Sequence, residues 1–248
     1  NHKSPFCWTS EALKSVQRQS KPDAIEWLSD EIINALFHSF KKAGGEVIAI
    51  MADGEPLLGF NYQFLKRVAL QTNKQSLGML IFTNGELLDE KTMAEHSSIN
   101  QRIAFPISID AGNEEKYEQV HGAMGAYKRV IKNKNAWMQF DAKNKRENFH
   151  RIAIHTVISS HIDGGEMETI KNLVKDIGNV PWIVSTLGIA GDARINKTLF
   201  RKDAEETRKL IEKYSTGPTA IDPKKHNCSY IVSEWHDNCM YGITFHPF

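Results

Sequence analysis

The sequence predicts an α/β fold, a partial (β/α)6 barrel followed by a short C-terminal extension. Two observations predict this class. Apolar, β-rich runs alternate with amphipathic helical stretches from residue 20 onward, and each run ends in turn-forming residues. Such alternation favours parallel βα units over hairpins. We expect the barrel to occupy residues 1–215 and the extension, which is rich in Pro, Asn, His and Cys, to occupy residues 216–248.

Five runs are expected to form strands, because each is short and apolar and stops at turn residues. They lie at residues 46–51, 79–83, 103–109, 151–158 and 182–189. A further strand is possible in the extension, at residues 230–232.

The helices are expected between these strands. The first opens at Lys21-Pro22-Asp23, since proline and an acid are favoured in a first turn. Ile25, Leu28, Ile32, Leu36 and Phe40 then form one apolar stripe that stops at Gly44-Gly45. The later helices are expected near residues 60–68, 89–96, 114–142 with interruptions at Gly122 and Gly125, 167–177 and 204–214.

A helix that precedes the first strand needs explanation, because parallel strands are joined through helices and pair on both sides. The simplest explanation is a sixth strand upstream of Asn1, and the chain does open without methionine. No internal repeat of about 20–50 residues is found, which excludes a solenoid.

Composition excludes several classes of function. The chain has 248 residues, of which 41% are apolar and 25% charged, as is usual for a soluble globular protein. A formal net charge of +1 gives no indication of a nucleic-acid partner. No apolar run is long enough to cross a bilayer. Three cysteines, an odd number, favour a reducing cytoplasm over a disulfide framework.

The most informative segment is Asp53-Gly54-Glu55-Pro56, at the end of the first expected strand. It places backbone carbonyls and a carboxylate at the C-terminal end of a strand. Both are acceptors, so the arrangement suits an ammonium group. Taken alone, the segment is also compatible with an ordinary βα loop.

The segment resembles the Gly-Gly-Glu-Pro sequence that holds the methionyl amino group of S-adenosylmethionine (SAM) in radical SAM enzymes, with Asp53 in place of the first glycine. The resemblance extends over residues 20–200 and implies a partial TIM-like barrel. Thr83-Asn84-Gly85 is similar to that family's Thr-Asn-Gly, and Ser108-Ile109-Asp110-Ala111 to its Ser-Leu-Asp-Gly. Val120-His121-Gly122 is similar to the start of its His-x-x-Arg-Gly segment.

The resemblance implies a set of cofactor-binding residues. Asp53, Gly54 and Glu55 would position the methionyl amino group of SAM. Asn84, Ser108 and Asp110 would contact its ribose and carboxylate, and His155, Val157 and Leu187 would border its adenine.

Simpler structural interpretations remain open for several of these positions. Asn84-Gly85 is a favourable turn pair, and Ser108 and Asp110 are suitable caps for the next helix. His155 lies among apolar residues, as a core histidine would.

The family's iron–sulfur cluster implies three thiolates in the order Cys-x-x-x-Cys-x-x-Cys, and this sequence has no such triplet. One interpretation places the triplet upstream of Asn1, together with the sixth strand. The other is a relative without a cluster. Cys7 alone cannot hold a cluster.

Two His–Cys pairs in the extension leave three alternatives open. His226 and Cys228 lie about ten residues before His236 and Cys239. Zinc accepts imidazole and thiolate together, although these are not the spacings of a common finger. The alternatives are an auxiliary cluster and two isolated cysteines in a packed tail.

The resemblance therefore implies an enzyme that uses SAM and a [4Fe–4S] cluster. Reductive cleavage of SAM would give a 5′-deoxyadenosyl radical that abstracts hydrogen from a small-molecule or peptide substrate, with an external electron donor. The alternatives are a cluster-less α/β-barrel enzyme or SAM-binding module, and a structural or peptide-binding protein on the same barrel. No nucleic acid or membrane partner is expected.

Overall fold

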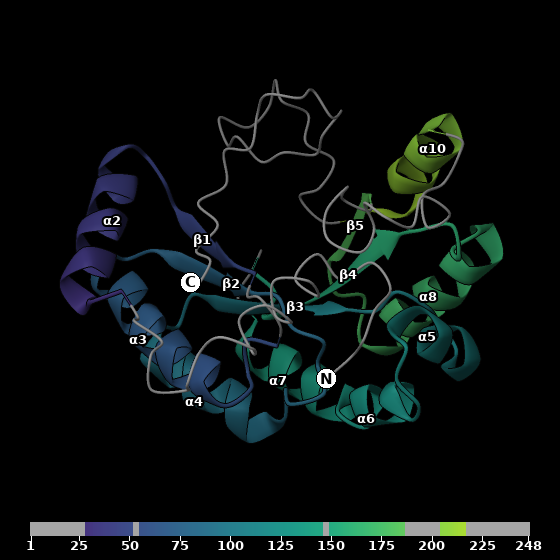
Figure 1. The fold of residues 1–248 in the computed structure, drawn as a ribbon, viewed down its shortest axis with the longest axis horizontal. Coiled ribbons are helices and arrows are strands. Elements are labelled where there is room, and N and C mark those ends of the chain that lie inside the picture. Colours follow the sequence, from purple (N-terminus) through teal and green to yellow (C-terminus); the bar gives the residue numbers. More distant parts are fainter. Residues whose placement is uncertain (1–27, 52–54, 146–148, 187–203, 217–248) are drawn as a thin grey trace, which may run out of the picture.

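Five parallel strands form one curved sheet in the computed structural model, which describes residues 28–51, 55–145, 149–186 and 204–216. Their order in the sheet is their order in the chain. Figure 1 shows the sheet curling from β1 to β5, with helices α3, α4, α7 and α8 on its outer side. The strands are β1 (Val47–Ile50), β2 (Gly78–Ile81), β3 (Ile103–Ser108), β4 (Ile152–Ile158) and β5 (Trp182–Thr186).

This arrangement confirms the expected parallel half-barrel and its five strands. The central strand β3 is buried along almost its whole length, and Ile103, Phe105 and Ile107 are fully enclosed. Parallel strands covered on both faces read as continuous apolar runs rather than alternating ones, which is why the runs were visible in the sequence.

Pro106 interrupts the pairing of β3 with β2. Its carbonyl accepts a hydrogen bond from Thr83 N at 3.1 Å, so the position of its missing N–H also faces β2. The regular register pairs Met79 with Ile103 and Leu80 with Ala104, and an isolated bridge then joins Thr83 to Ile107. The ladder has a gap at Pro106 because proline has no hydrogen to donate.

Four helices begin at residues whose side chains accept a hydrogen bond from the first turn. Ser29, Asp89, Asn113 and Asp163 cap α2, α4, α5 and α8 in this way. Each such cap stabilises its helix by about 1 kcal/mol. The helices are α2 (Asp30–Lys42), α3 (Phe60–Lys74), α4 (Glu90–Ile99), α5 (Glu114–His121), α6 (Ala126–Ile131), α7 (Lys134–Asn144), α8 (Gly164–Asp176) and α10 (Ala204–Tyr214).

One helix prediction needs correction, and another is confirmed. The first described helix begins at Asp30, with Ser29 as its cap, so one continuous helix from Lys21 to Phe40 was wrong. The long helical region after β3 is split into α5, α6 and α7. Gly122 adopts the left-handed conformation, φ 61°, and ends α5, as the sequence predicted.

Several predictions lie outside the described residues. These concern Asp53, Gly54 and Leu187, the three cysteines, the sixth strand and the C-terminal extension. None of the helices in the described ranges is both long and apolar enough to span a membrane.

Candidate SAM site at the strand ends

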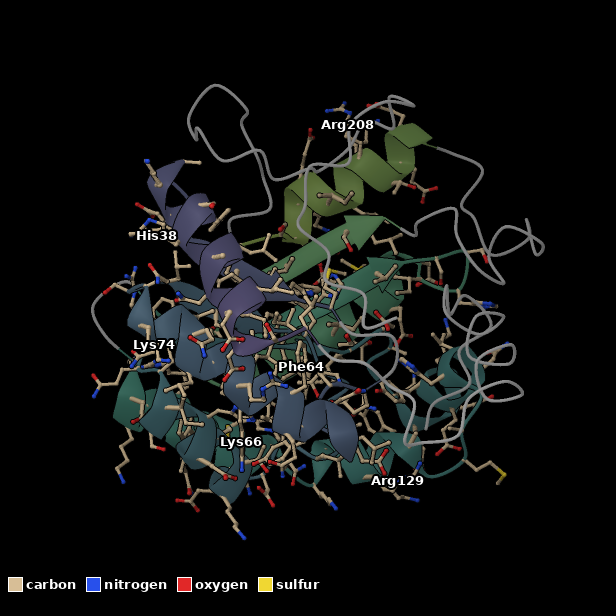
Figure 2. All side chains as sticks on the ribbon, turned by 60° about the vertical axis from the view of Figure 1, so that its left-hand side comes forward. His38, Phe64, Lys66, Lys74, Arg129 and Arg208 are labelled. Atoms are coloured by element: carbon tan, nitrogen blue, oxygen red, sulfur yellow. The ribbon has the colours of Figure 1, made fainter. Side chains whose placement is uncertain are left out.

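The predicted site residues that the structure describes lie at or near the C-terminal ends of the parallel strands. Because all five strands run in one direction, their C-terminal ends meet at one edge of the sheet. Lys74 ends the helix that leads into β2, and Arg129 pairs with Glu86 just after β2. In Figure 2, Lys74 lies at the left, on the side where β2 begins, and Arg129 lies at the lower right, on the side where β2 ends.

Glu55 joins the loop after β1 to the end of β2. Its Oε1 atom accepts hydrogen bonds from Leu57 N at 3.1 Å and from the Thr83 hydroxyl at 2.6 Å. Its Oε2 atom accepts from Asn84 N at 2.9 Å. The carboxylate is therefore fixed by donors from two neighbouring loops rather than by its own loop alone.

Burial raises the pKa of Glu55 above its usual value, and the three hydrogen bonds only partly oppose this effect. The negative charge of Glu86 raises the pKa further. No ion pair joins Glu55 to a lysine, arginine or histidine in the described parts of the chain. A carboxylate with these properties is stabilised by a bound cation.

Side chains at the start of α7 hold the loop after β2 in place through hydrogen bonds. Asn133 donates to the carbonyls of Gly85 and Glu86 at 3.0 and 3.1 Å, and Trp137 Nε1 donates to Leu88 O at 2.8 Å. Gly85 has φ 80°, and a Cβ there would lie 2.7 Å from Ile107 and 2.9 Å from Trp137. Only glycine fits this turn without displacing its neighbours.

Asn84 takes part in the site through its backbone. Its side-chain Oδ1 accepts from Glu86 N at 2.9 Å, which closes the turn after β2. Its backbone N–H is the group that binds Glu55. The structure thus agrees with the turn interpretation of this pair and adds a contact that the sequence did not indicate.

Asp110 is buried and extends the pairing of β3 with β4. Its Oδ1 atom accepts from Val157 N at 2.7 Å, and its Oδ2 atom lies 3.3 Å from Nε2 of the buried His121. The cap of the next helix is Asn113, so the interpretation of Asp110 as a helix cap was wrong. Asp110 and Val157, predicted separately, are hydrogen-bonded to each other.

His155 and Ser108 occupy paired positions on β4 and β3. His155 Nε2 lies 2.9 Å from the hydroxyl of Ser185 on β5, and the ring packs edge-on against Phe82. Burial lowers the pKa of His155, although the nearby Asp110 partly opposes this shift. A lowered pKa favours the neutral imidazole, which is compatible with a flat apolar ligand beside it.

The structure therefore forms two groups of predicted residues: Glu55 with Asn84, and Asp110, Val157, Ser108 and His155 along β3 and β4. Three further residues contact them directly: Thr83, His121 and Ser185. Thr83 and His121 belong to motifs that the sequence had indicated, and Ser185 belongs to the fifth expected strand, but each contact joins two different elements. A single sequence shows strand ends but not which atoms of neighbouring ends meet.

The described residues do not form a metal site. No group of three or more His, Cys, Asp or Glu side chains suited to a metal occurs among them. All three cysteines lie outside the described ranges, so the described residues include no thiolate that could hold an iron–sulfur cluster. The carboxylate of Glu55, in contrast, is an acceptor that fits the ammonium group of an amino acid.

Comparisons with known proteins agree with the fold. A search of curated proteins finds no significant match. Two crystal structures of Streptococcus suis SuiB have the same fold. The SAM-bound form has a TM-score of 0.61 at 15% identity, covering 86% of this chain and 44% of that one. The form bound to precursor peptide SuiA has a TM-score of 0.60 at 15% identity, covering 86% and 42%.

The chain thus spans less than half the length of these structures. The profile of the Radical SAM superfamily matches residues 1–144, more than half of the sequence. This chain belongs to the radical SAM superfamily.

Proposed function

We propose that the chain binds SAM at the C-terminal ends of its strands and forms part of a radical SAM enzyme. The observation that supports this most directly is the half-buried carboxylate of Glu55, which accepts three hydrogen bonds and has a raised pKa. Superfamily membership implies SAM and a [4Fe–4S] cluster as cofactors. Bound SAM, cleaved reductively with electrons from an external donor, supplies the radical that abstracts hydrogen from a substrate.

In this proposal the protein's own residues bind and orient SAM. The ionised carboxylate of Glu55 accepts hydrogen bonds from the methionyl ammonium group, a charge-assisted interaction. Val157 and His155 on β4 border the adenine, where the neutral imidazole avoids placing a charge against an aromatic ring. Asp110 holds the backbone of β4 in place through Val157 N.

The predicted roles of Ser108 and of the Asn84 side chain remain part of the proposal. Both residues lie at strand ends beside the Glu55 and Asp110 contacts. Asp53, Gly54 and Leu187 belong to the same proposed set through the family's sequence pattern.

We propose a peptide as the substrate, with a small molecule as the alternative. The support is the fold shared with SuiB, whose structure contains a precursor peptide.

Glu55→Gln tests the cofactor site. In the full-length polypeptide, reconstituted anaerobically with iron and sulfide, SAM affinity is measured by titration calorimetry. Loss of a charge-assisted hydrogen bond is expected to weaken binding by about tenfold or more. Production of 5′-deoxyadenosine after reduction is measured in the same samples.

Glu95→Gln is the matched control. Glu95 lies on α4, in the outer layer of helices, and contacts Tyr62 and Lys66 of α3. It should bind SAM like the wild type. Equal affinity of the Glu55→Gln variant and the wild type would overturn the assignment of Glu55. A wild-type protein that binds no SAM and forms no 5′-deoxyadenosine would favour the cluster-less alternative.

A further inference from the structure

Thr83, the residue that follows β2 by two positions, is fixed on every side. It is only 2% exposed. Its backbone N donates to Pro106 O, and its carbonyl accepts from Ser108 N at 2.8 Å. Its hydroxyl accepts from Gly85 N at 3.1 Å and donates to Glu55 Oε1 at 2.6 Å. The hydroxyl therefore has one orientation available, toward the Glu55 carboxylate.

The three hydrogen bonds to Glu55 are distributed unequally over its two oxygen atoms. Oε1 accepts two, from Leu57 N and the Thr83 hydroxyl, which matches the two lone pairs of a carboxylate oxygen. From the described residues Oε2 accepts one, from Asn84 N. Oε2 is thus the oxygen with remaining capacity to accept a hydrogen from a ligand.

We propose that Thr83 is a positioning residue for the cofactor: its hydroxyl, with Leu57 N, holds Oε1 and so directs Oε2 of Glu55 toward the ammonium group of SAM. This inference rests on the proposed function, and it adds a residue that acts on SAM only through Glu55.

The same hydroxyl favours the ionised form of the Glu55 carboxyl group. Of the hydrogen bonds that lower the pKa of Glu55, the bond from Thr83 has the largest effect. Removing it leaves burial and the charge of Glu86 to raise the pKa further. Glu86 is itself paired with Arg129, and the buried Tyr117 on α5 is the other titratable group that interacts with the Glu55 charge. A neutral Glu55 cannot pair with an ammonium group.

The test uses variants of Thr83 in the reconstituted full-length polypeptide. Thr83→Val keeps the shape and removes the hydroxyl, Thr83→Ala removes the hydroxyl with less bulk, and Thr83→Ser keeps it. SAM dissociation constants are measured by anaerobic calorimetry from about pH 6 to about pH 9. Thermal unfolding of each variant is recorded in parallel.

Thr83→Val and Thr83→Ala are expected to bind SAM about tenfold more weakly near pH 7. The difference in SAM affinity between these variants and the wild type should become smaller as pH rises. The reason is that Glu55 has a higher pKa in the variants, so it becomes neutral, and binding is lost, at a higher pH than in the wild type. Thr83→Ser should stay within about threefold of the wild type at every pH.

Thr72→Val is the control for a purely structural effect. Thr72 is equally buried, and its hydroxyl donates to Ala69 O and accepts from Asn100, away from the C-terminal ends of the strands. This variant should lose thermal stability without any change in the pH profile of SAM binding.

Two results would overturn the inference. One is wild-type SAM affinity in the two variants that lack the hydroxyl. The other is a loss of SAM affinity that has the same size at every pH and that also occurs in Thr83→Ser. If Glu55→Gln weakens binding while the Thr83 variants do not, only the positioning role fails. If Glu55→Gln also binds normally, the proposed site itself fails.

Discussion

His96 is a titratable side chain in the core with no hydrogen-bond partner among the described residues. It lies on α4, fully buried, and neither ring nitrogen has a partner there. Its ring packs edge-on against Tyr62 and Phe105. Burial lowers its pKa from 6.5 to about 4, because the charged imidazolium is poorly solvated in this position.

This histidine predicts a fall in stability in mild acid. Between pH 6.5 and about 4 the unfolded chain binds a proton that the folded chain does not. Stability therefore decreases as pH falls through that window, by about 3 kcal/mol for this residue. Urea unfolding at several pH values measures the free energy of unfolding.

A His96→Leu variant isolates the contribution of this residue. It removes the titrating group while keeping a similar apolar volume. The variant should lose less stability than the wild type between pH 6.5 and about 4. Parallel pH profiles for the two proteins would contradict the prediction and would show that His96 is solvated or paired.

At the level of single elements, Asp110 replaces part of a strand. The strand β3 ends at Ser108, yet the Asp110 carboxylate accepts the next hydrogen bond from β4, at Val157 N. The Thr156 hydroxyl donates to Ile109 O at 2.7 Å and accepts from Trp182 Nε1 at 2.9 Å. Side chains thus continue the contact between β3, β4 and β5 past the end of β3.

Asp110→Ala is expected to destabilise the protein by about 1–3 kcal/mol, because the half-buried Val157 N is left without its acceptor. Asp176→Ala is the matched control, since that carboxylate lies at the end of α8 and is 64% exposed beside Lys134. An exposed pair contributes about 0–1 kcal/mol. Equal losses in the two variants, measured by urea unfolding, would contradict the role given to Asp110.

The strands could be predicted from the sequence because burial on both faces leaves an uninterrupted apolar run. The start of α2 could not be predicted, because the sequence offers two suitable helix starts, Ser29 and Lys21-Pro22-Asp23. Pro106 alone argues against a central strand, and the structure accommodates it through a gap in one ladder only.

For the site, the sequence predicted which strand ends carry polar residues. It did not predict that Glu55 binds Thr83 and Asn84, or that Asp110 faces His121. The contacts of Glu55 depend on the register of neighbouring strands, and the contact of Asp110 with His121 depends on how α5 packs against the end of β3. Parallel register is visible only once the strands are paired.

At the level of the whole molecule, β3 is the central strand of the sheet, and β1 and β5 are its two edge strands. The strand β3 is hydrogen-bonded to β2 and β4, whereas among the described residues β1 pairs only with β2. Figure 1 shows β1 at one end of the curve beside α2.

This topology predicts a gradient of amide hydrogen exchange in the 248-residue chain. Exchange is expected to be slowest in β3 and β4, where opening requires disruption of the core, and faster in β1. Mass spectrometry of peptides that cover these strands measures it. Protection of β1 equal to that of β3 would contradict the prediction and would indicate a further strand beside β1.

The anchoring of the β2 loop by α7 has a consequence for how this protein can change. Asn133 and Trp137 hold the turn from which Asn84 reaches Glu55, yet both belong to a helix on the outside of the curve. In the proposed function, substitutions at these two positions would change the affinity for a ligand that neither residue contacts. Affinity could therefore be adjusted from the outer side of the sheet while the residues that contact the ligand stay unchanged.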